Sequence, residues 1–275
     1  MSVVARRYLS VFRMRFLLLL QYRTAAVAGF ATQCWWGLIK VMVFAAFYRS
    51  TVARQPIDFA QAVTYTWLGQ AFLALLPWAA DVDIAEMVRS GAVSYERLRP
   101  LDTYFYWYAR STAWNLARAV PRSLLMFAFA GLLLPLVGLG GWRLRLPSGG
   151  EAAALFAAAM CGQVLLSSAF VMLLNLGCLV TLSDRGVNAV AVPFVLALSG
   201  NIIPLQFFPS WLQRFMFAQP FAGLLDIPNR IYFGGLRGAV ALMGIAHIVV
   251  WASLLVLGGH RLMRTALSRL EVQGG

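Results

Sequence analysis

The sequence is poor in acidic residues and almost devoid of lysine. It has 10 Asp and Glu residues against 23 Lys and Arg residues, and Lys40 is its single lysine. A Walker A loop needs a lysine that follows a glycine and precedes Ser or Thr, because that lysine holds the nucleotide phosphates. Lys40 stands between Ile39 and Val41, so the chain has no such loop. If the protein uses energy, we expect that energy to come from a partner or from an ion gradient.

Residues that commonly build catalytic or metal sites are also scarce. His247 and His260 stand alone, without the spacing of a zinc-binding HExxH motif. Ser199-Gly200 lacks the preceding glycine of a nucleophile elbow, and no acidic residue lies centrally in an apolar run. The cysteines lie inside apolar runs without metal or disulfide spacing, and are expected to be buried packing residues: Cys34, Cys161 and Cys178. The pattern argues against an intramembrane enzyme and against a metal site.

Apolar residues, in contrast, are abundant. The chain of 275 residues is 61% hydrophobic, with nine Trp, 19 Phe and a mean hydropathy of +0.73. This composition predicts an all-α polytopic membrane protein. Six apolar runs are long enough to cross a hydrocarbon core of ~30 Å at ~1.5 Å per residue. The expected spans cover residues 24–48, 59–80, 114–139, 152–182, 187–208 and 239–259.

The formal net charge of +13 points to anionic lipid head groups as partners. No basic run with interleaved exposed aromatics lies outside the segments that flank the apolar runs, so no nucleic acid is expected. Residues 1–23 alternate arginines with apolar and aromatic residues, which predicts an amphipathic helix that lies on the membrane surface. We therefore divide the chain into this interface helix and a transmembrane domain over residues 24–275.

A dense cluster of charge interrupts the apolar runs between residues 81 and 102. It holds five of the 10 acidic residues and three arginines, so it cannot lie in lipid. Asp81 is placed to cap a short helix, and Ser90-Gly91 is placed to end it. Ile84 and Val88, four residues apart, then share one apolar face. The pattern indicates either a compact element that docks into a groove on another subunit or only a solvated polar loop.

Two further features suggest a polar path through the apolar runs. The first span contains Gln33 and Lys40, and an intramembrane lysine is a functional candidate unless it snorkels to the outer surface, which we favour here. The fifth span contains Pro193 and Pro204, which are expected to interrupt its helix. Residues 209–238 are too apolar for a free loop and too broken for a clean span. They are expected to form short helices that dip into the outer leaflet.

The distribution of arginines sets the expected orientation. The N-terminal segment, residues 81–102, Arg185 and the C-terminal segment together carry more arginines than the segments on the other side of the expected membrane. The positive-inside rule therefore places both termini and the charged segment in the cytoplasm.

Several runs of the sequence resemble the permeases of the ABC-2 type transporter family, in a bacterial subgroup with an RSG…YELLRPLD-like segment. Here that segment is Arg89-Ser90-Gly91, followed by the run from Tyr95 to Asp102, YERLRPLD. Tyr22 to Ala26, Ser199 to Leu205 and Phe208-Pro209 are similar to the same subgroup. The resemblance covers nearly the whole chain. Arg97 departs from it, because many relatives carry an apolar residue there.

The resemblance implies six transmembrane helices, an interface helix over residues 1–23, a coupling helix in 81–102 and re-entrant outer helices in 209–238. It also implies two permease subunits, identical or paralogous, above two ATP-binding subunits that hold ATP and Mg²⁺, in the bacterial cytoplasmic membrane. The densest charges of the coupling segment are expected to face the ATP-binding subunit: Glu86, Arg89, Glu96, Arg97 and Arg99. A path lined by spans one, two and five, with Gln33, Lys40, Pro193 and Pro204, would carry a hydrophobic or amphipathic export substrate.

Two alternatives from other classes stay open on the sequence alone. An ion-coupled secondary transporter would be expected to show inverted repeats and a mid-membrane carboxylate, and neither is apparent. A membrane scaffold that transports nothing is the second alternative. Copurification with an ATP-binding subunit would distinguish the exporter from both.

Overall fold

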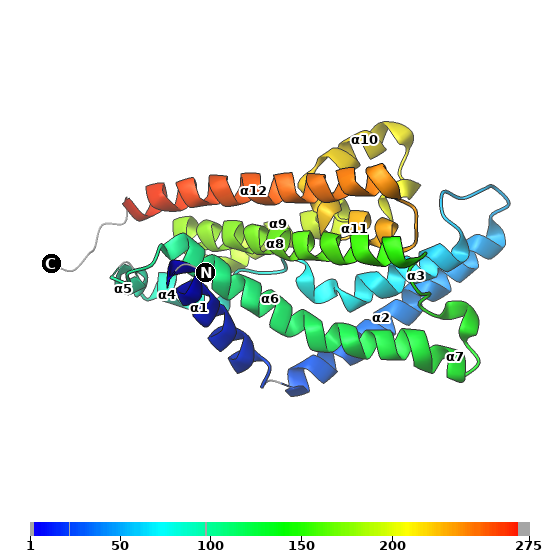
Figure 1. Ribbon diagram of the computed structural model, residues 1–275, viewed down its shortest axis with the longest axis horizontal. Helices are drawn as coiled ribbons and strands as arrows, with labels where there is room; N and C mark the ends of the chain where they lie inside the picture. The colour runs from blue at the N-terminus through cyan, green and yellow to red at the C-terminus, as the bar shows by residue number, and fades with distance from the viewer. Residues whose placement is uncertain (1–2, 22, 97, 269–275) are drawn as a thin grey trace.

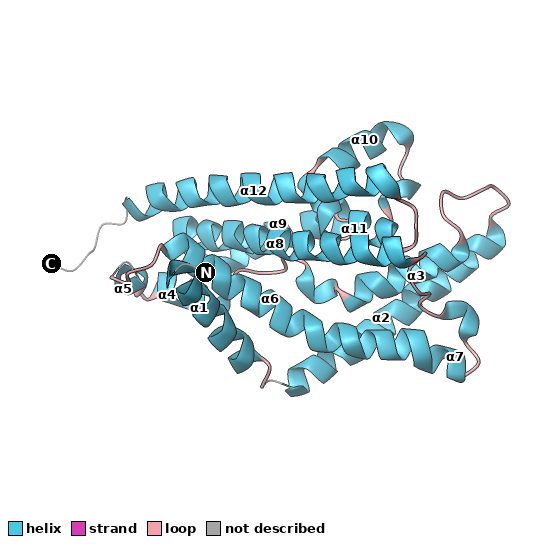
Figure 2. Ribbon diagram, viewed as in Figure 1, coloured by secondary structure: helices cyan, strands magenta, loops and turns pink. Residues whose placement is uncertain are grey.

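The computed structural model describes residues 3–21, 23–96 and 98–268, and within these residues it is helical, without a β-strand (Figures 1 and 2). The prediction of an all-α protein is confirmed. The longer α-helices are α1 (Val3–Leu19), α2 (Arg23–Ser50), α3 (Phe59–Ala71), α6 (Thr103–Ala128), α8 (Gly150–Thr181), α9 (Asp184–Leu198) and α12 (Gly238–Ser268). The shorter ones are α4 (Val82–Arg89), α5 (Val93–Glu96), α7 (Leu134–Leu136), α10 (Ser210–Ala218) and α11 (Asp226–Tyr232).

Four helical stretches in the described part of the chain are long and apolar enough to cross a membrane. They cover residues 26–50, 103–136, 150–181 and 238–268. The third expected span begins earlier than predicted, because α6 starts at Thr103 and continues through a π-helical segment, η2 (Phe129–Leu133), into α7. The second and fifth expected spans are not continuous helices. With 13 and 15 residues, α3 and α9 extend only ~20–23 Å at ~1.5 Å per residue.

The second span ends early because a proline follows Leu76. Leu76 adopts an extended backbone (ψ 142°), as a residue before proline does, and only the 3₁₀ turn η1 (Leu73–Leu75) separates it from α3. The carbonyl groups freed by this ending find partners on neighbouring helices. Arg118 of α6 donates to the carbonyl of Ala74 at 3.0 Å, and the Ser167 hydroxyl of α8 donates to that of Leu75. Side chains of α6 and α8 thus replace the missing helical hydrogen bonds in an apolar environment.

Helix α8 forms the centre of the bundle. It is the most buried of the four long stretches and contacts α12, α6, α11 and α9. Leu166 packs in one buried cluster with residues of α11 and α12, and Met172 in another with residues of α4 and α6. The core is therefore continuous along α8 from one end of the molecule to the other.

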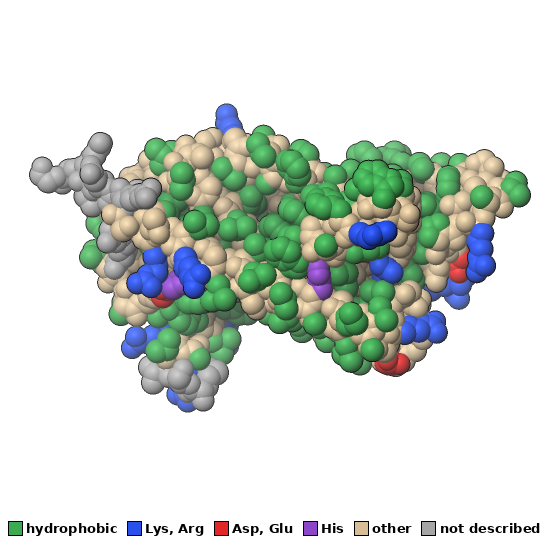
Figure 3. Space-filling view, turned by 90° about the horizontal axis from the view of Figure 1, so that it is seen from above, with side chains coloured by type: hydrophobic (Ala, Val, Ile, Leu, Met, Phe, Trp, Pro, Cys, Tyr) green, Lys and Arg blue, Asp and Glu red, His purple; other side chains and the backbone are tan. Residues whose placement is uncertain are grey.

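The two ends of the molecule differ. Both termini, α4 and α5 lie at one end, whereas the loop after α2, α7 and α10 lie toward the other (Figure 1). In the view of Figure 3, hydrophobic side chains cover most of the middle, and the Lys and Arg side chains lie mainly toward the two ends. This distribution agrees with a protein whose middle is surrounded by lipid.

Helix α1 confirms the helix predicted for the N-terminal segment, over Val3–Leu19. It packs along the first part of α6, where the Asp102 backbone N–H donates to the Tyr8 hydroxyl at 3.1 Å and the rings of Tyr8 and Phe105 meet edge to face. Its other face, which includes Arg13 and Met14, is exposed. Its position on a membrane surface stays a prediction.

Two smaller expectations have opposite outcomes. Residues 209–238 form short helices as predicted, α10, the 3₁₀ segment η5 (Pro220–Leu224) and α11, and α11 is mostly buried against α8. The expectation of three buried cysteines is wrong for Cys161, which is exposed on α8, whereas Cys178 is buried and Cys34 is partly buried.

Candidate functional site

The charged segment folds into the short helix that its sequence predicts. The Asp81 carboxylate caps α4 by accepting from the Asp83 backbone N–H at 3.0 Å, and α4 ends at Arg89, before Gly91 with φ of +74°. Ile84 and Val88 point into the core as predicted. The segment is therefore a folded element and not a loop, and its docking to another subunit stays a prediction.

Long-range polar contacts fix the entry to α4. The backbone N–H of Asp81 donates to the Asn175 side-chain oxygen at 2.8 Å, and that of Ala80 donates to Asn188 at 3.1 Å. Asn175 lies on α8 and Asn188 on α9. The start of α4 is therefore bonded to two longer helices.

Of the predicted contact residues on α4, Glu86 and Arg89 are exposed. Their side chains form an ion pair at 2.7 Å with exposed fractions of 67% and 48%, and Arg89 also reaches Asp184 at the start of α9, 3.3 Å away. The hydrogen bond that Arg89 donates to the Glu86 carboxylate raises the pKa of the Arg89 guanidinium above its ordinary value. Both residues can therefore present charge to a partner.

The other predicted contact residues behave differently. Glu96 is 6% exposed and pairs with Arg99 at 3.1 Å, so it faces the protein and not the solvent. Arg99 is half exposed and donates to the Tyr106 hydroxyl at 2.8 Å. Arg97 lies outside the described residues. The expectation that all of these charges point outward is corrected for Glu96.

Sequence reasoning missed a second set of ion pairs, at the start of α4. Asp83 lies 2.5 Å from Arg15 of α1 and 3.2 Å from Arg110 of α6, and Arg15 is also 3.6 Å from Asp81. These contacts tie the N-terminal helix, α4 and the start of a long helix together. The only sequence signal for these ion pairs is the presence of opposite charges in amphipathic segments, and this signal does not specify which residues pair.

The second candidate site is the expected polar path. There, the helix of the fifth expected span ends with α9. Helix α9 continues through Pro193, whose ring is exposed, so the predicted interruption at Pro193 is wrong. The chain turns instead at Gly200, with φ of +84°, where an added side chain would collide with the Tyr65 hydroxyl. Pro204 is buried and precedes the 3₁₀ turn η4 (Leu205–Phe207). Residues 199–204 are called the hinge below.

Lys40 ends on this hinge. Its Nζ donates to the backbone carbonyl oxygen of Asn201 at 2.6 Å, beside Tyr65, Pro204 and Leu225. The expectation that Lys40 snorkels to the outer surface is therefore wrong. Gln33, two turns earlier on α2, is 3% exposed, and its side-chain oxygen has no hydrogen-bond partner among the described residues.

Asp226 holds the other side of the hinge. It is fully buried at the start of α11, and one of its oxygens accepts from the Tyr65 hydroxyl and from the Leu205 backbone N–H, both at 3.1 Å. Tyr65, on α3, also donates to the carbonyl of Gly200 at 3.0 Å. Arg230 lies 3.8 Å from the second oxygen. Sequence reasoning missed Tyr65 and Asp226, because neither stands in a recognisable motif.

Taken together, the candidate sites are a charged helix at one end and a polar hinge within the bundle, and neither resembles a catalytic centre. In the described part of the chain, no group of His, Cys, Asp and Glu side chains is arranged to hold a metal ion.

One family model, described as ABC-2 family transporter protein, matches residues 34–274. A search of curated proteins found no match to the chain. The matched region includes α4, the hinge, three of the four long helical stretches in full and the first from residue 34 onward.

Proposed function

Since this chain belongs to the ABC-2 transporter family, we propose that it is the membrane subunit of an ABC exporter that carries a hydrophobic or amphipathic molecule. A separate ABC ATP-binding subunit, in two copies, binds ATP and Mg²⁺ and supplies the energy. A second permease subunit, identical or paralogous, completes the complex. The membrane is the bacterial cytoplasmic membrane, with both termini in the cytoplasm.

One observation carries the proposal: α4 is a charged helix at the end of the molecule where α1 begins and α12 ends (Figure 1). Its outer face presents Glu86 and Arg89, while its inner face is buried through Ile84 and Val88. Because the apolar face of α4 is already buried within the chain, contact with an ATP-binding subunit would be made by the charged face, where complementary charges on the partner would fix the orientation of docking. The bonds of α4 to Asn175 and Asn188 give a route from that contact to α8 and α9.

The path is proposed to run past the hinge. Gln33, Lys40 and the hinge carbonyls place polar groups among helices that are otherwise apolar, as an amphipathic substrate requires. In this proposal the hydrogen bond from Lys40 to Asn201 closes the route, and export requires that bond to lengthen. We expect the hinge to move when α9 is displaced through Asn188 and α4.

The direct test is transport by the purified complex in proteoliposomes, with fluorescent amphiphiles as probes. ATP-dependent accumulation that disappears without the ATP-binding subunit, or with its catalytic glutamate replaced, would support the proposal. Transport by the permease alone, driven by a proton or sodium gradient, would support a secondary transporter. No transport and no ATPase stimulation across a broad panel of probes would favour a scaffold.

A further inference from the structure

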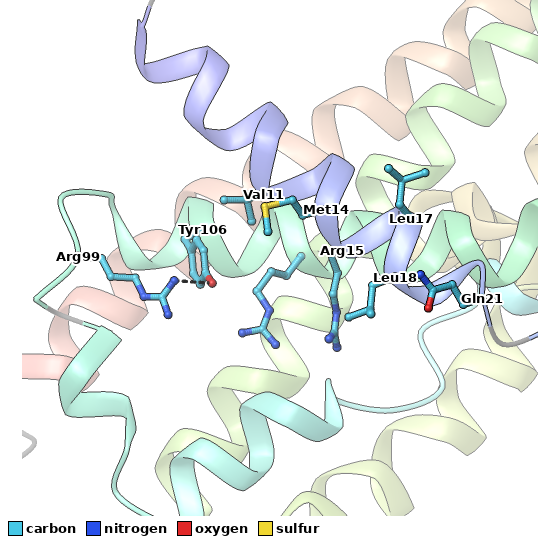
Figure 4. A pocket seen from close by; sticks show the side chains of 9 residues that line it. Val11, Met14, Arg15, Leu17, Leu18, Gln21, Arg99 and Tyr106 are labelled. Carbon is cyan, nitrogen blue, oxygen red and sulfur yellow. Dashed lines mark hydrogen bonds between the residues drawn. The ribbon is translucent and has the colours of Figure 1, made fainter.

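A groove of about 560 Å³ lies between α1 and the start of α6 (Figure 4). Helix α1 contributes the apolar lining residues Val11, Met14, Leu17 and Leu18 together with Arg15, and Gln21 follows it. The other side is polar and is lined by Arg99, Tyr106 and Arg110. The volume is within the range of ~300–1,000 Å³ that is typical of small-molecule sites. The groove is therefore amphipathic across its width.

The polar side is basic. Three guanidinium groups line the groove and no carboxylate does. Arg15 and Arg110 each reach Asp83 through one terminal nitrogen, whereas a guanidinium carries five N–H donors. Arg99 crosses the face of the Tyr106 ring, 4.8 Å from its centre, and is half exposed. Helix α1 itself has four arginines and no acidic residue.

We propose that this groove binds an anionic phospholipid. The phosphate would lie among Arg15, Arg99 and Arg110, since guanidinium groups bind phosphate oxygens in bidentate, charge-assisted pairs. The first part of an acyl chain would lie along Val11, Met14 and Leu18. A soluble phosphate would leave this apolar side uncovered, whereas a zwitterionic lipid would add a cation beside three arginines. The occupant is therefore an anionic lipid of the surrounding leaflet.

The bound lipid would share its arginines with α4. Arg15 and Arg110 are the residues that tie Asp83 to α1 and α6. A phosphate beside them shares their positive charge with Asp83, so lipid occupancy weakens the ion pairs that hold α4 to α1 and α6. The site thereby gives the leaflet an influence on the charged helix, and this holds whatever the protein transports.

The site can be tested on the purified full chain, without a transport assay. Native mass spectrometry in detergent would measure the affinity of the first adduct of phosphatidylglycerol and of phosphatidylcholine with matched chains. Loss of one charge-assisted contact predicts that Arg15→Gln weakens phosphatidylglycerol binding roughly tenfold. Arg13→Gln is the matched control. It removes the same charge two residues before Arg15, but from the exposed face of α1. Val11→Trp fills the apolar side with the arginines intact and should also weaken binding.

The expected result is a preference for phosphatidylglycerol that Arg15→Gln and Val11→Trp reduce and Arg13→Gln preserves. Equal affinity for the two lipids would overturn the proposal. An equal loss in Arg13→Gln and Arg15→Gln would also overturn it, because it would show attraction to the general charge of α1. Displacement of the lipid by glycerol 3-phosphate at equal concentration would show a headgroup site only and would contradict the acyl contact. If Arg15→Gln does not fold, the result with Val11→Trp decides.

Discussion

Lys40 and Asn201, 161 positions apart in the sequence, are joined by a hydrogen bond of 2.6 Å from the lysine Nζ to the asparagine backbone carbonyl. This contact connects the first long helix to the hinge where the fifth expected span ends. The carbonyl belongs to a stretch that has left the helix, so its usual helical partner is absent. A charged donor within α2 thus stabilises a break in a neighbouring apolar segment.

Replacement of Lys40 by Met should therefore impair both stability and transport. The substitution keeps a similar bulk but removes the donor, and a hydrogen bond to a charged group contributes about 1.5–3 kcal/mol. We expect a lower thermal midpoint in detergent and reduced substrate-stimulated ATPase activity. Lys40→Arg should recover part of both. Arg49→Met, at the exposed end of the same helix, is the control and should resemble the wild type.

A second prediction concerns the contact between Tyr65 and the hinge. Tyr65→Phe removes the hydroxyl that donates to Asp226 and to the carbonyl of Gly200, and leaves both acceptors buried. A buried group without its partner costs about 1–3 kcal/mol, which should appear in the free energy of unfolding. Tyr95→Phe serves as control, because Tyr95 is 72% exposed. Equal stability of the two variants would show that the hydroxyl of Tyr65 does not hold the hinge.

A third prediction concerns Gly37, where α2 and α3 approach closely. A methyl group at this position would collide with the ring of Trp67, which is fully buried. Gly37→Ala should therefore lower stability by about 1–3 kcal/mol, the usual effect of overpacking. Gly131→Ala is a matched control within an apolar helical segment, because nothing lies within 4 Å of the added methyl group. A neutral Gly37→Ala would mean that α2 and α3 separate easily.

The interface helix can be tested by spin labels at successive positions from 6 to 20. The structure predicts a helical period, with positions 8, 11, 12, 15, 16 and 19 protected by α6 and the positions between them more accessible. Oxygen and a polar nickel reagent would then distinguish lipid from water at the accessible positions. If α1 lies on a leaflet, their ratio should also vary with a helical period. Uniform access to the nickel reagent would exclude the membrane surface.

The local structure of the charged segment could be predicted from its sequence, whereas its anchoring could not. A cap at Asp81, an end at Ser90-Gly91 and an apolar face are determined by residues within one or two turns of each other. The partners Asn175 and Arg15 lie far away in the chain. Asparagine within an apolar run and arginine within an amphipathic one are compatible with many contacts, so the sequence could not select these.

The number of continuous spans was overestimated for a related reason. Hydropathy reports whether a residue tolerates lipid or a protein core, and it does not report whether the backbone remains helical. The apolar run continues past Leu76 and past Gly200, but the backbone leaves the helix at both places. The proline after Leu76 was a usable signal that the prediction did not weigh. Pro193 had the opposite effect, since the helix continues through it.

The central claim, that α4 binds the ATP-binding subunit through its outer charges, is tested most directly by copurification. The measurement is the amount of ATP-binding subunit retained per permease after affinity purification of the coexpressed pair. The variant exchanges the two charges, Glu86→Arg with Arg89→Glu, which preserves the ion pair within α4 but reverses the outward pattern. Its control is the exchange Arg143→Glu with Glu151→Arg, at the opposite end of the molecule, where both residues are exposed. We predict that the α4 exchange loses most of the ATP-binding subunit and that the control retains it, and equal retention in both would contradict the claim.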